Sequence, residues 1–267
     1  MQKIPFFKKD DTNIYYIKEG EGEPLVLISG LGSKMSWTFQ LPFFRERMMV
    51  ITLHNRGTGN SSRPNYPYTM DMFVEDINNL LNYLEIEEKI HLCGISMGGV
   101  IAQHFVLKYP ERVKTLILCA TTPKLNSKPA MEHFTQNADI NERFKTYLSY
   151  AHSREFRKKL KQDKELYDTL RSLYVENPTR AQDYLNQASA SIDHDTTDLL
   201  HKIMQPTLIM GGTKDRLVPL SPHSEILHEK IPNSELKTFE GLGHSFIIED
   251  VDAVNKEIWD FVKKHLG

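Results

Sequence analysis

The chain has 267 residues, of which 40% are hydrophobic and 25% are charged, so it is long enough to bury a large core without disulfide or metal staples. Its 33 basic and 35 acidic residues give a formal net charge of −2, which provides no general attraction to nucleic acid or to an anionic membrane. Aromatic and branched apolar residues occur along the full length, which argues against intrinsic disorder.

Cysteine content and hydropathy indicate a reducing, aqueous compartment. Cys93 and Cys119 each stand inside an apolar run, so we expect two buried free thiols. Residues 1–16 lack the apolar stretch of a signal peptide, and no segment has the ~18 uninterrupted apolar residues of a membrane span. We therefore expect a cytoplasmic protein that enters no membrane.

Short apolar runs alternate with longer helical patterns, which is typical of parallel strands joined by crossover helices. The predicted strands are bounded by Gly, Pro or charged residues, and they cover residues 14–17, 25–28, 48–53, 90–93, 115–119, 207–210 and 236–239. The third of them is apolar except at Thr52, as expected of a strand that is covered on both faces. The fold class is therefore α/β with a mainly parallel sheet.

Between several of these strands the apolar period changes to 3.6 residues. One helix has Thr69 or Asp71 as its candidate cap, and its apolar stripe consists of Phe73, Ile77, Leu80, Leu81 and Leu84. A second helix follows Gly99 and stops at Pro110, and a third, amphipathic helix over residues 254–262 comes near the end of the chain.

Residues 122–201 break this alternation, because they show helical patterns but no convincing strand. We interpret them as a helical cap over one edge of the sheet, with residues 1–121 and 202–267 forming the core domain. The stretch contains 12 basic and 12 acidic residues, so its basic cluster at residues 157–161 is interpreted as a solvated helix face rather than an anion site.

The sharpest motif is the G-x-S-x-G pattern of residues 94–98, which follows a predicted strand directly and opens a helix. Such an abrupt turn forces Ser96 into a strained backbone conformation and raises its hydroxyl above the sheet edge. Gly94 and Gly98 are required because the strand and helix backbones approach too closely for a Cβ atom. Glycine-rich turns also bind phosphates, but the chain has neither the P-loop lysine nor G-x-G-x-x-G spacing. Ser96 is therefore the candidate nucleophile.

A serine hydroxyl needs a base, and His244 is the best placed of the eleven histidines. It follows the last predicted strand in the sequence Gly-Leu-Gly-His-Ser, at the edge where open α/β sheets collect ligands. Asp215 follows the preceding strand and can accept the Nδ1–H of His244, which fixes the tautomer of the ring. The chain order Ser96, Asp215, His244, with each residue after a different strand, predicts a Ser–His–Asp relay.

Acyl transfer also needs donors for the developing oxyanion. The backbone N–H of Met97, directly after the nucleophile, is the expected first donor. The second is expected from the N–H of Leu31, because the flanking Gly30 and Gly32 allow the backbone to turn that donor inward.

Together these motifs resemble the α/β-hydrolase superfamily over essentially the whole chain, and most closely its small bacterial cap-bearing carboxylesterases and enol-lactonase-like hydrolases. Residues 54–61 resemble that group's D-x-R-G-x-G-x-S turn, and residues 109–113 resemble the segment that closes the helix after the elbow. The resemblance implies an eight-stranded, mainly parallel sheet flanked by helices, and hydrolysis of a small-molecule ester or lactone through an acyl-enzyme without cofactor or metal.

The chain departs from this family pattern at two positions. Ser29 replaces a histidine that helps to brace the oxyanion loop, and His54 stands where the turn usually has aspartate. We expect a structural rather than a catalytic role for His54.

Aromatic residues near these loops and in the cap are candidates for an apolar substrate pocket, although packing between helices and sheet explains any single one of them. They are Trp37, Phe39, Phe134, Phe144, Tyr147, Tyr150 and Phe156. A serine at the nucleophile position disfavours epoxide hydrolases and haloalkane dehalogenases, which carry a carboxylate there. A carbon–carbon bond hydrolase and a triad-retaining ligand receptor stay open as alternatives, as does perhydrolysis as a side activity. No oligomeric state follows from the sequence.

Overall fold

The computed structural model describes residues 5–9, 12–34, 36–125 and 139–267. Within these ranges the strands form one eight-stranded sheet with the order β1-β2-β4-β3-β5-β6-β7-β8. Their bounds are β1 (Phe6–Lys9), β2 (Thr12–Glu19), β3 (Pro24–Ile28), β4 (Met49–Leu53), β5 (Ile90–Ile95), β6 (Val113–Cys119), β7 (Thr207–Gly212) and β8 (Ser234–Phe239). The β1–β2 and β2–β4 pairs are antiparallel, and the other neighbours are parallel. The predicted α/β fold with a mainly parallel sheet is confirmed.

All seven strands predicted from the sequence are present, and β1 is the addition. Its four residues, Phe-Phe-Lys-Lys, pair with β2 at the edge of the sheet and bury only Phe7. So short an edge strand shows neither a continuous apolar run nor a full alternation, which explains why the sequence pattern did not predict it.

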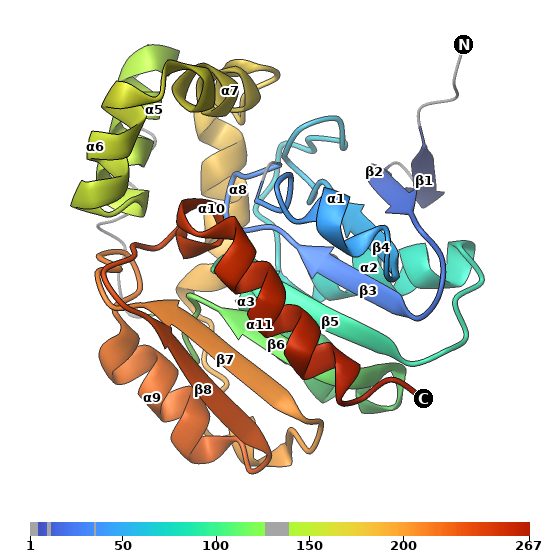
Figure 1. Ribbon diagram of the computed structural model, residues 1–267. Coiled ribbons are helices and arrows are strands. Elements are labelled where there is room, and N and C mark those ends of the chain that lie inside the picture. The colour runs from blue at the N-terminus through green and yellow to red at the C-terminus, as the bar shows by residue number, and fades with distance from the viewer. Residues whose placement is uncertain (1–4, 10–11, 35, 126–138) are drawn as a thin grey trace.

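Two helical layers cover the sheet, because successive residues of a strand point to opposite faces. Val26 and Ile28 of β3 pack on one face with three helices, α2 (Met70–Tyr83), α3 (Met97–Lys108) and α9 (Leu220–Lys230). Leu25 and Leu27 pack on the other with α1 (Leu41–Phe44), α10 (Phe246–Glu249) and α11 (Val251–Lys263). Figure 1 shows α11 lying across the front of the sheet. Burial on both faces accounts for the unbroken apolar runs.

Helix boundaries follow local capping chemistry. The Thr69 hydroxyl accepts a hydrogen bond from the Met72 N–H at 3.4 Å and begins α2, as predicted. Asp250 caps α11 in the same way, through the N–H of Ala253 at 3.1 Å. α3 ends before Pro110, which opens the short 3-10 helix η1 (Pro110–Arg112).

Between β6 and β7 the described chain forms four α-helices, here called the cap helices. They are α5 (Ile140–Ala151), α6 (Arg154–Gln162), α7 (Lys164–Val175) and α8 (Ala181–Ile192). Figure 1 shows them together above the carboxyl ends of the parallel strands. The basic residues of α6 lie on its solvent side, while Phe156 and Leu160 are buried, so the cluster at residues 157–161 is a solvated face. The division of the chain at residues 122 and 201 stays a prediction.

Two further expectations concern thiols and membranes. Cys93 and Cys119 are buried free cysteines whose sulfur atoms lie 4.0 Å apart, as expected, and burial raises the pKa of the Cys93 thiol well above its usual value. None of the described helices is long and apolar enough to span a bilayer.

Candidate active site

Ser96 occupies the sharp turn between β5 and α3, with φ 56° and ψ −122°. A positive φ is rare for a residue with a side chain and marks local strain, which the hydrogen bond from the Ser96 N–H to the Cys119 carbonyl helps to hold at 2.9 Å. A Cβ atom on Gly94 would lie 2.2 Å from the carbonyl oxygen of Gly98, and one on Gly98 would lie 2.2 Å from that of Ile28. Both glycines are therefore required, as the motif predicts.

Asp215 and His244 meet at the carboxyl edge of the sheet. The Nδ1 atom of His244 lies 2.8 Å from Oδ2 of Asp215, and the two residues are only 8% and 7% exposed. The other carboxylate oxygen of Asp215 accepts the backbone N–H groups of Leu217 and Val218 at 2.8 and 2.9 Å. Because these bonds hold the carboxylate in place, it selects the tautomer of His244 that donates from Nδ1 and leaves Nε2 as the acceptor.

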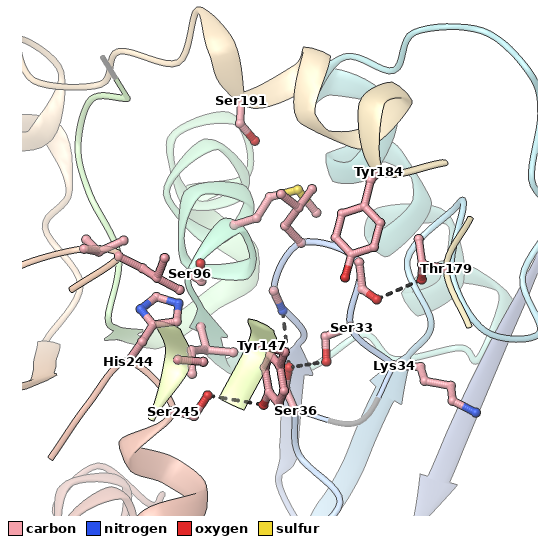
Figure 2. Close-up of a pocket in the computed structure, with 18 of the residues that line it drawn as sticks. Ser33, Lys34, Ser36, Ser96, Tyr147, Thr179, Tyr184, Ser191, His244 and Ser245 are labelled. Carbon is pink, nitrogen blue, oxygen red and sulfur yellow. Dashed lines mark hydrogen bonds between the residues drawn. The ribbon is translucent and has the colours of Figure 1, made fainter. Parts of the chain in front are cut away.

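Ser96 and His244 line the same cavity, and Figure 2 shows the serine hydroxyl beside the imidazole ring. Between these two described residues the structure contains no hydrogen bond. Hydrogen bonds of this kind are often long or poorly aligned until substrate binds, and rotation about χ1 moves a serine hydroxyl at little cost.

The cavity that joins these groups has a volume of about 210 Å³ and lies between the sheet edge and the cap helices. Leu31 and Met97, the residues expected to supply the oxyanion donors, both line it. So do Tyr147 and Tyr184 from the cap helices. One cavity is thus lined by the candidate nucleophile, its base and both expected oxyanion residues, Ser96, His244, Met97 and Leu31. Asp215 lies behind the imidazole ring.

Of the aromatic residues suggested for the substrate pocket, Tyr147 lines the cavity. Its hydroxyl lies 3.3 Å from Oγ of Ser245, and burial raises the pKa of Tyr147 to about 12. Phe134 lies outside the described residues.

Trp37 and Phe144 do not line the cavity, so the prediction that they form the pocket wall is wrong. Trp37 is 2% exposed and Phe144 is 1% exposed, and both belong to the apolar core on the α11 side of the sheet. Phe144 instead supports the wall from behind, since its ring packs against Tyr147 and Tyr174 at centroid distances of 6.5 and 5.3 Å. The other three described candidates also lie off the wall: Phe39, Tyr150 and Phe156. Apolar aromatics fill the layer between cap and sheet, and periodicity does not separate that layer from a cavity.

The loop that carries Leu31 is held by residues that sequence reasoning missed. The N–H of Gly32 donates to Oε1 of Gln187 at 2.8 Å. The carbonyl of Gly32 accepts a hydrogen bond from the Thr179 hydroxyl at 2.8 Å (Figure 2). Gln187 also donates from Nε2 to the carbonyl of Arg56 at 2.6 Å and is fully buried. Both backbone groups of the residue next to Leu31 are therefore fixed from the cap side. No motif in the sequence links these positions.

Ser29, which stands where the family has a histidine, is anchored through its backbone. Its carbonyl accepts a hydrogen bond from Nδ2 of Asn55 at 3.0 Å, and the residue is 1% exposed. The Ser36 hydroxyl, which donates to Ser33, accepts a long hydrogen bond of 3.5 Å from the Gly30 N–H. Contacts from neighbouring segments and from Gln187 hold the loop where the family's histidine is absent.

The loop of His244 is tied to the cap through Glu249, another residue without a sequence signal. Its Oε1 atom accepts a hydrogen bond from the N–H of Gly243 at 3.2 Å. The same atom accepts one from the N–H of Ser153, the N-terminal capping residue of helix α6, at 2.8 Å. The ring of His152 lies beside this carboxylate at 3.4 Å, and burial lowers the pKa of that imidazole. The base therefore sits on a loop whose position depends on where α6 begins.

His54 lies away from the cavity wall. Its Nδ1 accepts the N–H of Asn60 at 3.0 Å, and its ring packs on Tyr15 with centroids 4.5 Å apart. Burial lowers the pKa of His54 to about 4, so the ring is neutral at physiological pH. These contacts stabilise the turn at residues 54–61. Among the residues that the structure describes, no group of three or more His, Cys, Asp or Glu side chains is arranged to hold a metal ion.

The sequence and the structure of this chain were both compared with those of known proteins. The sequence profile described as "alpha/beta hydrolase fold" matches residues 23–251. The chain is 27% identical over 259 residues to 3-oxoadipate enol-lactonase 2 of Acinetobacter baylyi, covering 95% of this chain and 94% of that protein. It is 26% identical over 273 residues to the non-heme haloperoxidase of Rhodococcus erythropolis, covering 97% and 100%. Among solved structures, an esterase from Exiguobacterium antarcticum superposes with a TM-score of 0.83 at 27% identity, covering 97% of this chain and 98% of that one.

Proposed function

This chain belongs to the alpha/beta hydrolase fold family, and from that premise we propose that it is a serine hydrolase that cleaves a carboxylic ester or lactone through an acyl-enzyme. The observation that carries the proposal is the 2.8 Å hydrogen bond between Asp215 and His244, on a ring that shares one cavity with Ser96 on its strained turn. The esterase and enol-lactonase relatives support ester and lactone substrates.

In the first half of the reaction the Ser96 Oγ attacks the substrate carbonyl carbon while Nε2 of His244 takes the hydroxyl proton. Asp215 stabilises the imidazolium that forms, and the N–H groups of Met97 and Leu31 hold the oxyanion. When the carbonyl re-forms, the carbon–oxygen bond to the leaving alcohol breaks, and His244 returns the proton to that oxygen. The acyl group is then esterified to Ser96.

In the second half a water molecule repeats the sequence. His244 takes a proton from water, the resulting hydroxide attacks the acyl carbon, and Ser96 leaves with the proton returned by the imidazolium. Hydrogen peroxide can replace water as the nucleophile in this step, which is consistent with a relative named as a haloperoxidase. Perhydrolysis is therefore the second candidate activity of the same acyl-enzyme.

The mechanism is tested by labelling the protein with a fluorophosphonate and mapping the modified peptide by mass spectrometry. We expect modification at Ser96, and loss of both labelling and p-nitrophenyl ester hydrolysis in Ser96→Ala. Ser172→Ala, an exposed serine of α7, is the matched control and should retain both. Label on another residue, or unchanged hydrolysis by Ser96→Ala, would contradict the proposal. The number of sites that the label titrates gives the number of ester molecules hydrolysed per active site. A value far above one indicates an enzyme rather than a receptor that reacts once.

A further inference from the structure

The charge of the cavity is one-sided. Two basic side chains line it, those of Lys34 and Arg143, and none of the described lining residues is Asp or Glu. Lys34 is weakly paired at the rim, 3.7 Å from a Glu176 carboxylate whose side chain is 75% exposed. Arg143, from α5, is the cation that lies inside.

Arg143 is a buried charge without a counter-charge. The residue is 8% exposed, its Nη2 donates to the carbonyl of Thr179 at 2.7 Å, and its Nε has no hydrogen-bond partner. No carboxylate of a described residue lies within 4.0 Å of its guanidinium. A buried, unpaired charge is costly, so arginine is rarely retained in such a place without a partner.

Arg56 provides a comparison within the same molecule. It is also 8% exposed, but its Nε and Nη2 form a bidentate pair with Asp76, with both distances 2.7 Å. The fold thus neutralises a buried arginine that serves packing. Arg143 instead presents the same kind of planar donor group to the cavity of Ser96.

A second unsatisfied donor stands next to Arg143. Tyr174 lines the same cavity, and its buried hydroxyl has no hydrogen-bond partner of normal geometry, although the Tyr184 hydroxyl and the Arg143 guanidinium lie beside it. Burial raises the pKa of this hydroxyl, and the positive charge of Arg143 opposes that rise, so the phenol stays protonated and can donate. A guanidinium N–H beside a phenol O–H matches the two oxygens of one carboxylate.

Resting on the proposed function, we infer that Arg143 and Tyr174 form an anion subsite, and that the preferred substrates are esters or lactones bearing a carboxylate. The carboxylate binds the guanidinium of Arg143 beside Tyr174, while the scissile carbonyl lies at Ser96. The substrate class is then the half-esters of short dicarboxylic acids and carboxyl-bearing lactones. Arg143 binds substrate, and the bond-breaking steps at Ser96 are unchanged.

The test compares pairs of substrates of equal shape. Monoethyl glutarate carries a carboxylate where ethyl 5-methylhexanoate carries an isopropyl group, and the corresponding pairs from succinate and adipate vary the spacing. The ratio of kcat/KM for the anionic ester to that for its neutral partner measures the subsite. We expect this ratio to exceed one at one of the chain lengths and to fall as salt concentration rises.

Substitutions of Arg143 separate the effect of its charge on substrate binding from an effect on folding. Arg143→Met should lower kcat/KM for the anionic ester about 10- to 100-fold while changing the neutral ester less than about 3-fold. Arg143→Lys should recover part of the loss, because charge returns without the planar fork. Arg171→Met is the matched control, since this arginine of α7 bonds to Asn141 and does not line the cavity. An anionic preference that survives Arg143→Met, or equal losses for both esters, would overturn the subsite.

Binding to a protein that cannot turn over separates this inference from the mechanism. Isothermal titration of Ser96→Ala with monoethyl glutarate should show binding that is about 10-fold weaker or more in Ser96→Ala/Arg143→Met. If wild type hydrolyses none of the esters but this difference is present, the subsite stands and the proposed hydrolysis fails. If neutral esters are hydrolysed but the difference is absent, the hydrolysis stands and the subsite is wrong.

Discussion

The loops at the sheet edge and the cap helices hold the site by different means. Asp215 is fixed by backbone N–H groups two and three residues further along the chain. The cap reaches the site through side chains instead, as when Gln187 bonds to Gly32, 155 positions away, and to Arg56, 131 positions away. We infer that the chemistry belongs to the sheet edge, whereas the cap determines how firmly the oxyanion loop is held and which substrates bind.

Among the substitutions that test this difference between the sheet edge and the cap, we expect the largest effect on activity at Asp215. Asp215→Asn keeps the size of the side chain but removes the carboxylate that selects the tautomer of His244, so kcat should fall about 10³- to 10⁴-fold. KM should stay within a few-fold, because Asp215 lies behind the ring. Steady-state kinetics check this, with the exposed Asp168→Asn of the cap as control. A small change in kcat would mean that another group orients His244.

A smaller effect is expected when the cap's hold on the oxyanion loop is broken. Gln187→Met keeps the buried volume but removes the bonds to Gly32 and Arg56, so the N–H of Leu31 is held less firmly. Complete loss of one oxyanion donor typically costs about 10²–10³ in rate, and we expect about a 10-fold loss here. The loss should fall on kcat with KM nearly unchanged.

Gln182→Met, on the same helix, is the matched control for that experiment, since Gln182 bonds to its own helix through Asn186. Equal kinetic losses in the two variants, or an equal rise in KM, would show that the cap acts on the site through general packing. That result would break the division between the two regions.

The smallest effect concerns the amino edge of the sheet, which is remote from both regions. Burial by itself would raise the pKa of Glu23, but hydrogen bonds from Lys114, Gly267 and His91 outweigh burial and lower this pKa to about 2. The stabilisation is therefore present above the ordinary pKa of 4.5 and is lost as pH falls from there towards about 2. Glu23→Gln should lower stability at pH 7 by less than about 1 kcal/mol, because the ion pair is partly exposed.

Urea unfolding at pH 7 and at pH 3 measures this difference. The gap in midpoint between wild type and Glu23→Gln should narrow at the lower pH, while ester hydrolysis at pH 7 stays at the wild-type rate. A gap that widens on acidification would contradict the assigned direction. A change in activity would connect the amino edge with the site.

The sequence by itself was sufficient where a function depends on short-range backbone geometry. Gly94, Ser96 and Gly98 form a motif because strand, turn and helix must join within a few residues, and the steric reason can be stated without a structure. Strands buried on both faces were equally predictable, since nearly every position in them is apolar. Placing Asp215 and His244 together needed one more rule, that the carboxyl ends of parallel strands share an edge.

Only the tertiary structure decided which residues near the site face the cavity. Trp37 and Phe144 are aromatic residues of the kind that line apolar pockets, yet they pack in the core. Arg143 is a charged residue of the kind that is usually exposed on a helix, yet it is buried. Gln187 bonds to Gly32 and Glu249 bonds to Ser153, and no spacing rule connects either pair because its members are far apart in the chain. Amphipathic periodicity reports that a side chain is covered, but what covers it depends on how helices of different chain regions pack. That packing, and with it the preference for a substrate, is a property of the folded whole.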